Sequence, residues 1–313
     1  MCYNSGMSKK KSGIIRFIKL VFLLSFLAVI GYFISTLFHT EPVISPLPPK
    51  ETKPASVLAI FSKKKNPEEL KKMIKQKIGL DWKNYSVLVV DTKSDFRVAI
   101  NDTEMFTAAS VNKIPILAAL YIGIQNQDID PDKVITVQEE DIQDYGTGSI
   151  RYDGAGSTYT IKTLARLMMQ QSDNTAAYIL ANHIIGMDKI QSLLNEWGMT
   201  QTDMTSNKTS NNDIFKIMKK IYQGNIANPA YTQEMLAFFK DGEFEDRIPG
   251  LLPKTVQVYH KIGTEIGFLH DVGIIVGSTT TYYIGIFTSD ITDEKEATKL
   301  MAEVSKLIYE YMK

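Results

Sequence analysis

The chain contains almost no cysteine, and its charges cancel. Its one cysteine, Cys2, excludes an internal disulfide and a cysteine-based catalytic or metal site in the folded part. Lysine plus arginine number 35, as do aspartate plus glutamate, so the formal net charge is zero. A protein that binds nucleic acid needs an excess of basic side chains, and this balance gives no support for nucleic acid as a partner.

Histidine is also scarce, with four residues: His39, His183, His260 and His270. No two of them have the short spacing typical of zinc ligands. We therefore expect neither a metal centre nor a cofactor, and a metallo-hydrolase is disfavoured. We interpret His260 and His270 as residues that flank strands.

The N-terminal part begins with a basic tail and an apolar run. Residues 20–38 carry no charge and are about as long as a bilayer's hydrocarbon core requires. The lysines and the arginine of residues 1–19 predict that this tail stays cytoplasmic and that the rest of the chain is extracytoplasmic. We expect an uncleaved single-pass membrane anchor, because the run lacks an obvious small-x-small exit site. A cleaved signal peptide is the alternative.

Residues 39–65 are predicted to be a semi-rigid linker, because five of the chain's eleven prolines lie in this stretch. The folded domain is expected over residues 66–313, which are enough for a large core. It begins with Asn66 as a helix cap and Pro67 at the first helical position, and Gly79 ends this helix.

Apolar periodicity predicts strands at both ends of the domain and helices between them. The expected strands are residues 85–90, 96–100, 257–261, 270–276 and 282–288, and the expected helices are residues 114–124, 161–170, 175–185, 187–197, 214–222 and 294–311. The predicted fold class is α/β plus all-α, with an antiparallel sheet flanked by N- and C-terminal helices and an inserted helical domain. Residues 66–109 and 225–313 would form the α/β part, and residues 110–224 the helical part.

A serine followed three positions later by a lysine occurs three times, starting at Ser8, Ser62 and Ser110. Only Ser110 opens an apolar helix after a predicted hairpin. Only Ser110 combines that context with a downstream Ser172-Asp173-Asn174 and then Lys261-Ile262-Gly263. Taken alone, Ser110 or Asn174 would be interpreted as a helix cap. The ordered combination instead indicates an active-site serine.

These residue types fit acyl transfer. A serine hydroxyl is a weak nucleophile until a base removes its proton. Residues three positions apart on a helix share one face, so Lys113 can reach Ser110. Burial and the charge of Lys261 would lower the pKa of Lys113 and keep it neutral. Ser172 could relay a proton to a leaving nitrogen, the Asn174 amide could hold the substrate, and the backbone N–H of Ser110 suits an oxyanion.

The motifs resemble those of class A β-lactamase-type serine hydrolases, in the β-lactamase and penicillin-binding protein superfamily, over residues 66–313. Arg247-Ile248-Pro249, Leu252-Pro253 and His270-Asp271-Val272-Gly273 add to the resemblance. It implies an α/β sandwich domain beside an all-helical domain, with the active site between them. It also implies a small-molecule β-lactam or a cell-wall peptide as the substrate.

The resemblance further implies a role for each matching residue. Ser110 would be the acylated nucleophile, Lys113 its base, and Ser172 a third catalytic residue. The substrate-binding residues would be Asn174, Lys261, Gly263, Thr264 and Tyr145. The N–H groups of Ser110 and Thr264 would form the oxyanion hole. Tyr145 would be an aromatic at the pocket mouth, with packing on the surface as the alternative.

The chain departs from the family pattern in two places. Ile262 replaces the hydroxyl residue that such enzymes use on the substrate carboxylate, and Thr264 could compensate in part. Residues 198–231, where the β-lactamases carry a glutamate that positions the deacylating water, contain no glutamate. We interpret Asp203 as a turn residue and Asp213 as the cap of the helix over residues 214–222.

We therefore expect a membrane-anchored enzyme that β-lactams acylate on Ser110 and that releases them slowly. One alternative is a D-Ala-D-Ala peptidase or transpeptidase that acts on peptidoglycan with the same apparatus. The other is a non-catalytic cell-wall binding or sensor module of the same fold.

Overall fold

The computed structural model describes residues 65–313. The predicted basic tail, the membrane anchor and the linker up to residue 64 lie outside the described residues. Within the described part of the chain, no helix is both long and apolar enough to cross a membrane. The N-terminal predictions are therefore not tested by this structure.

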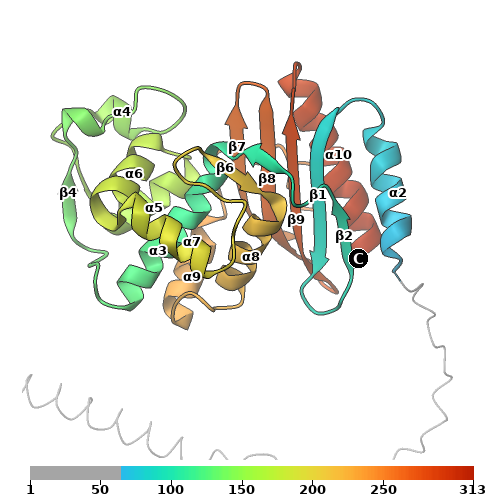
Figure 1. Ribbon diagram of the computed structural model, residues 1–313, viewed down its shortest axis with the longest axis horizontal. Helices are drawn as coiled ribbons and strands as arrows, with labels where there is room; N and C mark the ends of the chain where they lie inside the picture. The colour runs from blue at the N-terminus through green and yellow to red at the C-terminus, as the bar shows by residue number, and fades with distance from the viewer. Residues whose placement is uncertain (1–64) are drawn as a thin grey trace, which may run out of the picture. The chain divides into compact units, whose positions relative to one another are not determined.

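The centre of the molecule is an antiparallel five-stranded sheet (Figure 1). Its strands are β1 (Asn84–Asp91), β2 (Arg97–Ile100), β7 (Gln257–Glu265), β8 (Phe268–Val276) and β9 (Thr281–Ser289), in the order β2-β1-β9-β8-β7. Alternate residues face opposite sides, so Val87 and Leu88 belong to different apolar clusters. Because both faces are covered, the middle strand β9 is buried almost throughout.

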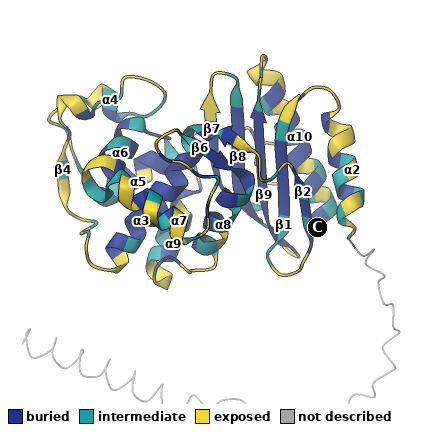
Figure 2. Cartoon of the chain, in the orientation of Figure 1, coloured by how far each residue is buried: buried dark blue, intermediate teal, exposed yellow. Residues whose placement is uncertain are grey.

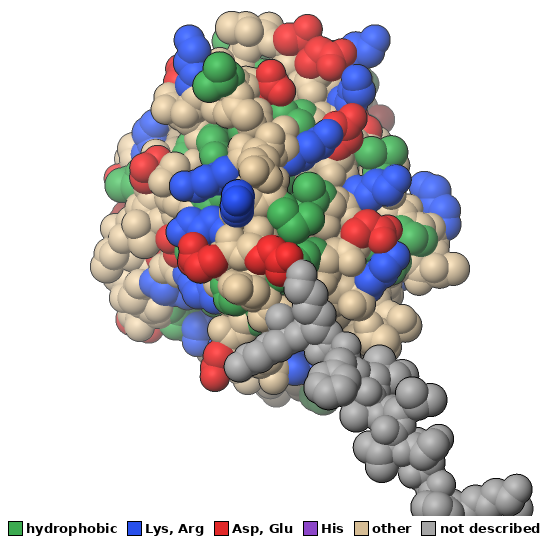
Figure 3. Space-filling view, turned by 90° about the vertical axis from the view of Figure 1, so that its right-hand side faces the viewer, with side chains coloured by type: hydrophobic (Ala, Val, Ile, Leu, Met, Phe, Trp, Pro, Cys, Tyr) green, Lys and Arg blue, Asp and Glu red, His purple; other side chains and the backbone are tan. Residues whose placement is uncertain are grey.

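Two terminal helices cover one face of the sheet. Helix α2 (Pro67–Ile78) begins as predicted, with the Asn66 side chain accepting from the N–H of Glu68. Helix α10 (Glu294–Met312) is capped by Asp293 in the same way. Their apolar sides pack with the sheet into one core, which the dark-blue strands and helix faces of Figure 2 show. Figure 3 shows that basic and acidic side chains are interspersed over this side of the molecule.

The other face of the sheet meets a helical part. Its helices are α3 (Lys113–Gln125), α4 (Ile150–Asp153), α5 (Ile161–Gln170), α6 (Asn174–Tyr178), α7 (Met187–Glu196), α8 (Asn211–Tyr222) and α9 (Pro229–Phe238). Helix α3 is apolar on nearly all sides and therefore lies buried in the middle. Helix α8 contacts both α3 and the sheet, and α9, which the sequence did not predict, packs on α3, α5 and α8. The predicted fold class is confirmed.

Two short strand pairs hold loops in place, the first at the junction of the two parts and the second at the outer side of the helical part (Figure 1). Strand β3 (Met105–Thr107) pairs with β6 (Lys208–Ser210), and β4 (Val134–Thr136) pairs with β5 (Thr158–Thr160). The predicted helix over residues 175–185 is the short α6 followed by a π-helical segment, Ile179–Ile185. The β3–β6 pair brings the loop before β6 next to the turn that carries Ser110, because the N–H of Ala108 donates to the carbonyl of Asn207 at 2.8 Å.

Candidate active site

Ser110 lies in a 3₁₀ turn, Ala109–Asn112, that leads directly into α3. Lys113 is the first residue of α3, and its Nζ lies 3.1 Å from Ser110 Oγ. Ser110 is therefore not the cap of an α-helix, although it stands at a helix N-terminus as expected. The preceding residue, Ala109, has a φ of 48°. A left-handed backbone costs energy for alanine, and such strain is concentrated at functional sites.

The side-chain nitrogen of Lys113 is surrounded by oxygen atoms of the Ser172 loop. Its Nζ lies 3.2 Å from Ser172 Oγ and 2.7 Å from Asn174 Oδ1, and it also donates to the Ser172 carbonyl. Only 5% of Lys113 is exposed. Burial, and then the positive charge of Lys261, lower the pKa of Lys113 well below its usual value, with Asp173 opposing. A lysine with a lowered pKa can act as a base, as the sequence predicted.

The Ser172-Asp173-Asn174 segment connects α5 to α6 with a sharp turn. Ser172 has a φ of 55°, which points to a second strained residue at the site. The cap of α6 is Asp173, whose side chain accepts from the N–H of Ala176. Asn174 is therefore free of the capping role. Its Nδ2 donates to the carbonyl of Tyr145 at 3.0 Å while its Oδ1 accepts from Lys113.

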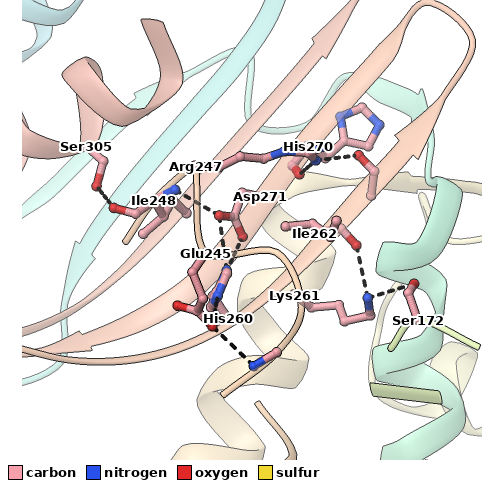
Figure 4. Close-up of polar contacts among 12 residues, drawn as sticks. Ser172, Glu245, Arg247, Ile248, His260, Lys261, Ile262, His270, Asp271 and Ser305 are labelled. Atoms are coloured by element: carbon pink, nitrogen blue, oxygen red, sulfur yellow. Dashed lines mark hydrogen bonds and ion pairs between the residues drawn. The ribbon is translucent and has the colours of Figure 1, made fainter. Parts of the chain in front are cut away.

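Lys261 reaches the same group from the sheet. It projects from β7, is 3% exposed, and places its Nζ 2.9 Å from Ser172 Oγ (Figure 4). Burial lowers its pKa to about 7, with Arg247 acting in the same direction and Asp271 opposing. Two buried lysines therefore meet at one serine hydroxyl. At neutral pH this hydroxyl can pass a proton in either direction.

The β7 backbone lies directly against the nucleophile turn. A Cβ on Gly263 would stand 2.9 Å from the carbonyl oxygen of Ala108, so only glycine allows this approach. The neighbouring Thr264 is exposed, and Ile262 is buried and contributes to the cavity wall. Strand β7 therefore brings its backbone close to Ser110 without a hydroxyl at position 262.

Arg247 is a functional candidate to which the sequence assigned no role. Its guanidinium donates from Nη1 to the carbonyls of Gly263 at 3.1 Å and His270 at 2.8 Å, and from Nη2 to Thr264 Oγ at 2.6 Å. The side chain is only 4% exposed, so its charge acts in a region of low dielectric constant. In the sequence, the only indication of a role for Arg247 is its place in the segment Arg247-Ile248-Pro249, which adds to the family resemblance.

His260 and His270 do not flank the strands. They lie inside β7 and β8, where both are buried. His260 Nδ1 lies 2.9 Å from Asp271 Oδ1, and its Nε2 lies 3.3 Å from Glu245 Oε1 (Figure 4). Burial alone would lower the pKa of His260, but the two carboxylates raise it to about 9. Asp271 also accepts from the N–H of Ile248 and so holds the turn that carries Arg247.

A cavity of about 1050 Å³ opens onto these groups. Ser110, Lys113, Ser172, Asn174 and Thr264 line it, as does Tyr145, whose side chain is 63% exposed. Lys261 and Gly263 are buried behind the wall and contribute through Ser172 and through the β7 backbone. The structure thus brings all eight residues predicted from the sequence to one place, while their roles in catalysis and binding remain predictions.

The two acids of the loop region do not line the cavity. Asp203 is a turn residue, as predicted, because its carboxylate accepts from the N–H groups of Thr205 and Ser206. Asp213 is not the cap of α8, since that cap is Ser210. Instead, the buried Asp213 accepts from the Gln201 N–H and pairs with Lys216.

The acids that do line the cavity are Asp246, Glu265 and Glu294. In residues 65–313, no hydrogen bond or ion pair joins any of these three carboxylates to Ser110 or Lys113. The same residues contain no cluster of three histidine, cysteine or acidic side chains that could hold a metal ion. Among the described residues, the side chains hydrogen-bonded to Ser110 or Lys113 carry hydroxyl, amine or amide groups.

Comparisons with known proteins agree with this geometry. A model of the beta-lactamase enzyme family matches residues 57–312. Beta-lactamase BRO-1 of Moraxella catarrhalis is 21% identical, over 67% of this chain and 74% of that protein. A beta-lactamase of Bacteroides uniformis is also 21% identical, over 68% of this chain and 81% of that protein.

Solved structures share the fold. PBP-A has a TM-score of 0.72 at 24% identity and covers 77% of this chain and 95% of its own. The TLA-1 extended-spectrum beta-lactamase has a TM-score of 0.71 at 20% identity, and the match covers 78% of this chain and 98% of that one. The chain belongs to the beta-lactamase enzyme family and is a serine hydrolase of the class A β-lactamase type. The resemblance inferred from the motifs is confirmed.

Proposed function

We propose that β-lactams acylate Ser110 and that the acyl-enzyme is released slowly. One observation carries the proposal: the Ser110 hydroxyl is hydrogen-bonded to a buried lysine, Lys113, which has a lowered pKa. The names of the relatives and the family support a β-lactam as the substrate.

Acylation uses the two lysines in sequence. Neutral Lys113 takes the proton from Ser110 Oγ while this oxygen attacks the lactam carbonyl carbon. The backbone N–H groups of Ser110 and Thr264 stabilise the oxyanion. The C–N bond of the lactam then breaks, and Ser172 passes a proton to the leaving nitrogen. Lys113 or Lys261 resupplies the proton to Ser172, because both contact its hydroxyl.

Recognition of an acidic substrate group falls to the end of β7. The Thr264 hydroxyl and the buried Arg247 charge beneath it replace, in part, the hydroxyl that Ile262 lacks. A charged donor strengthens a hydrogen bond to a carboxylate, so the Thr264–Arg247 pair suits a substrate carboxylate. Tyr145 and Asn174 flank the cavity at the side of the helical part and would hold the amide portion of the substrate.

Slow release is inferred because, in the described part of the chain, no carboxylate is hydrogen-bonded or ion-paired to Ser110 or Lys113. Asp203 and Asp213 are engaged elsewhere. Without a carboxylate to take its proton, the hydrolytic water is poorly activated. The solved structure of a PBP-A point mutant is an acyl-enzyme complex with penicillin G, and it shares the fold at a TM-score of 0.72. This likeness is one of fold and leaves the lifetime to experiment.

A peptidase or transpeptidase acting on D-Ala-D-Ala stem peptides is the second candidate, because it needs the same acylation apparatus and no carboxylate at this place. A peptide ester can be resolved by an amine acceptor as well as by water. Release of D-alanine from a stem-peptide mimic by wild type, with no release by Ser110→Ala, would favour the peptidase over the β-lactamase.

We also propose that residues 20–38 anchor the domain in a membrane, with the domain extracytoplasmic. The proposal is supported by the uncharged run and by the basic residues before it. Fractionation of cells that produce the full chain tests it. Recovery of the protein in the membrane fraction after a high-salt wash supports the anchor, and release of a shortened chain would indicate a cleaved signal peptide.

Labelling with a fluorescent penicillin tests acylation. Wild type should become labelled within minutes of mixing. It should keep the label after a chase with excess unlabelled penicillin. Ser110→Ala should not label, whereas Ser206→Ala, an exposed serine in the loop before β6, should label as wild type does. Absence of label on wild type would contradict the proposal and would favour a non-catalytic module.

A further inference from the structure

A buried histidine joins two carboxylates behind the wall of the cavity. His260 Nδ1 lies 2.9 Å from Asp271 Oδ1, and His260 Nε2 lies 3.3 Å from Glu245 Oε1 (Figure 4). We call these three residues the His260 clasp, and none of them is among the residues that line the cavity. A ring nitrogen donates only when it carries a hydrogen, so the ring donates to both carboxylates only in its protonated form.

The sheet leaves room for the buried ring. His260 in β7 lies opposite Gly273 in β8. A Cβ on Gly273 would stand 2.5 Å from the carbonyl oxygen of Tyr259 and 2.8 Å from His260 Cβ, so only glycine fits there. The N–H of His260 donates to the carbonyl of Phe239 at 2.9 Å, and the side chain of His260 is 5% exposed. A charged ring at this depth is stabilised by its pairing with two carboxylates.

The clasp holds the turn that carries Arg247 on both sides of this residue. Two residues before Arg247, the carboxylate of Glu245 contacts the ring and also accepts from the N–H of Gly242 at 3.2 Å. One residue after Arg247, the N–H of Ile248 donates to Asp271 Oδ2 at 2.9 Å (Figure 4). Arg247 therefore stands between two contacts that meet at one imidazole ring.

The contacts of the Arg247 guanidinium depend on where this turn holds it. It donates to the carbonyls of Gly263 and His270, on neighbouring strands, and to Thr264 Oγ at 2.6 Å. Thr264 lines the cavity that contains Ser110. Hydrogen bonds weaken steeply when their distance or angle departs from the preferred range, so a shift of the turn weakens the contact between Arg247 and the Thr264 hydroxyl.

We propose that the His260 clasp positions Arg247 and thereby sets how strongly the site prefers a substrate with a free carboxylate. The proposal rests on the acylation of Ser110 and on the recognition of the substrate carboxylate by Thr264 and Arg247. The three residues of the clasp act through the turn and touch no substrate, so they are positioning residues. The attack of Ser110 on the lactam carbonyl uses none of their contacts.

The test compares penicillin G with its methyl ester, which lacks the negative charge. Each competes with a fluorescent penicillin for the full chain, and the ratio of the two second-order rate constants measures the preference for the free carboxylate. Wild type should prefer penicillin G by about 10- to 100-fold, as expected of a hydrogen bond to a charged group. Any difference in the intrinsic reactivity of acid and ester cancels when a variant is compared with wild type.

The ratio should fall by about three- to tenfold in His260→Asn and in Glu245→Ala, while the rate constant for the ester stays within about twofold of wild type. Glu245→Gln should keep part of the ratio, because glutamine still accepts a hydrogen bond from the ring. Glu243→Ala is the matched control. Glu243 is exposed in the same segment and does not line the cavity, so its ratio should equal that of wild type.

A wild-type ratio in both His260→Asn and Glu245→Ala overturns the proposal. So does an equal loss of rate with acid and ester, because a purely structural role affects both substrates alike. The side chain of Glu245 is 44% exposed, so Glu245→Ala decides the question if His260→Asn does not fold. Equal rates of wild type with acid and ester would overturn the recognition of a carboxylate by Arg247, and absence of label on wild type would overturn the acylation of Ser110. The proposal falls with either.

Discussion

Lys113 and Ser110 are joined by a hydrogen bond of 3.1 Å between Nζ and Oγ, and only 5% of the lysine is exposed. The lysine is enclosed by oxygen atoms of Ser172 and Asn174, yet its own burial and the charge of Lys261 lower its pKa. The enclosure and the lowered pKa support the proposed role of Lys113 as the acceptor of the Ser110 proton.

Replacement of Lys113 by alanine should lower the rate constant of acylation by about 10²- to 10⁴-fold, because the serine loses its base. Lys113→Arg should be equally slow, since arginine keeps its proton at any ordinary pH. Stopped-flow labelling with a chromogenic or fluorescent β-lactam gives the rate constant. Lys93→Ala, at an exposed lysine in the turn between β1 and β2, is the control and should label normally. Fast acylation of Lys113→Ala would show that another group is the base.

Removal of the Lys261 charge should move the pH profile of acylation. The pKa of Lys261 is about 7, so below that pH it is charged and lowers the pKa of Lys113. Lys261→Met removes this repulsion, and the pKa of Lys113 rises. The acidic limb of the rate profile should therefore shift to higher pH, whatever happens to the maximal rate. If the acidic midpoint of the rate profile is the same in Lys261→Met as in wild type, the two lysines are not coupled.

Restoration of a hydroxyl at position 262 should improve acylation. Ile262 is 6% exposed and lines the cavity beside Thr264. Ile262→Thr adds one hydrogen bond to a substrate carboxylate, which is worth about 1 kcal/mol, or roughly fivefold in the second-order rate constant of labelling. Ile262→Val is the matched control, because it changes the volume without adding a hydroxyl. Equal rates for the threonine and valine variants would indicate that the substrate carboxylate lies elsewhere.

The buried His260 should make stability depend on pH. Its pKa is raised from 6.5 to about 9, so the folded state binds its proton more tightly than the unfolded state does. The resulting stability is fully present below pH 6.5 and is lost as pH rises through 9. It amounts to on the order of 3 kcal/mol. The free energy of unfolding of wild type relative to His260→Asn should shrink by that order between about pH 6 and pH 10, measured by urea titration.

A difference between wild type and His260→Asn that stays constant over this pH range would show that His260 is neutral in the fold. His183 offers a control, because its ring is half exposed and pairs with Asp141 on the helical side, away from the sheet. His183→Asn should leave the alkaline loss of stability as it is in wild type.

Much of the site was predictable because its parts follow local rules. Ser110 and Lys113 stand three positions apart, which places them on one face of a helical turn. Ser172 lies in a turn between two helices, and Lys261 lies in a predicted strand of the sheet. Each of these positions could be assigned from its own short segment. The order of the segments along the chain then indicated the family.

The contacts that the sequence did not reveal are tertiary. Arg247 donates hydrogen bonds to backbone carbonyls of two neighbouring strands. Such contacts cannot be predicted from residue types, because every residue carries a carbonyl. The hydrogen bond between Asn112 and Asn207 depends on a pair of three-residue strands, which are too short for a periodic signal. Asp213 was misassigned because Ser210, three residues earlier, is the better placed cap. Helix α9 has apolar residues on several sides, so its pattern showed no single stripe.

The lifetime of the adduct on Ser110 tests the central claim most directly. Wild type and Ser110→Ala are mixed with penicillin G, sampled over time by intact-protein mass spectrometry, and digested to locate the modified residue. The account predicts one penicilloyl group on Ser110 of wild type that persists for many minutes, and none on Ser110→Ala. An adduct on another residue, no adduct on wild type, or rapid multiple turnover without accumulation would contradict it.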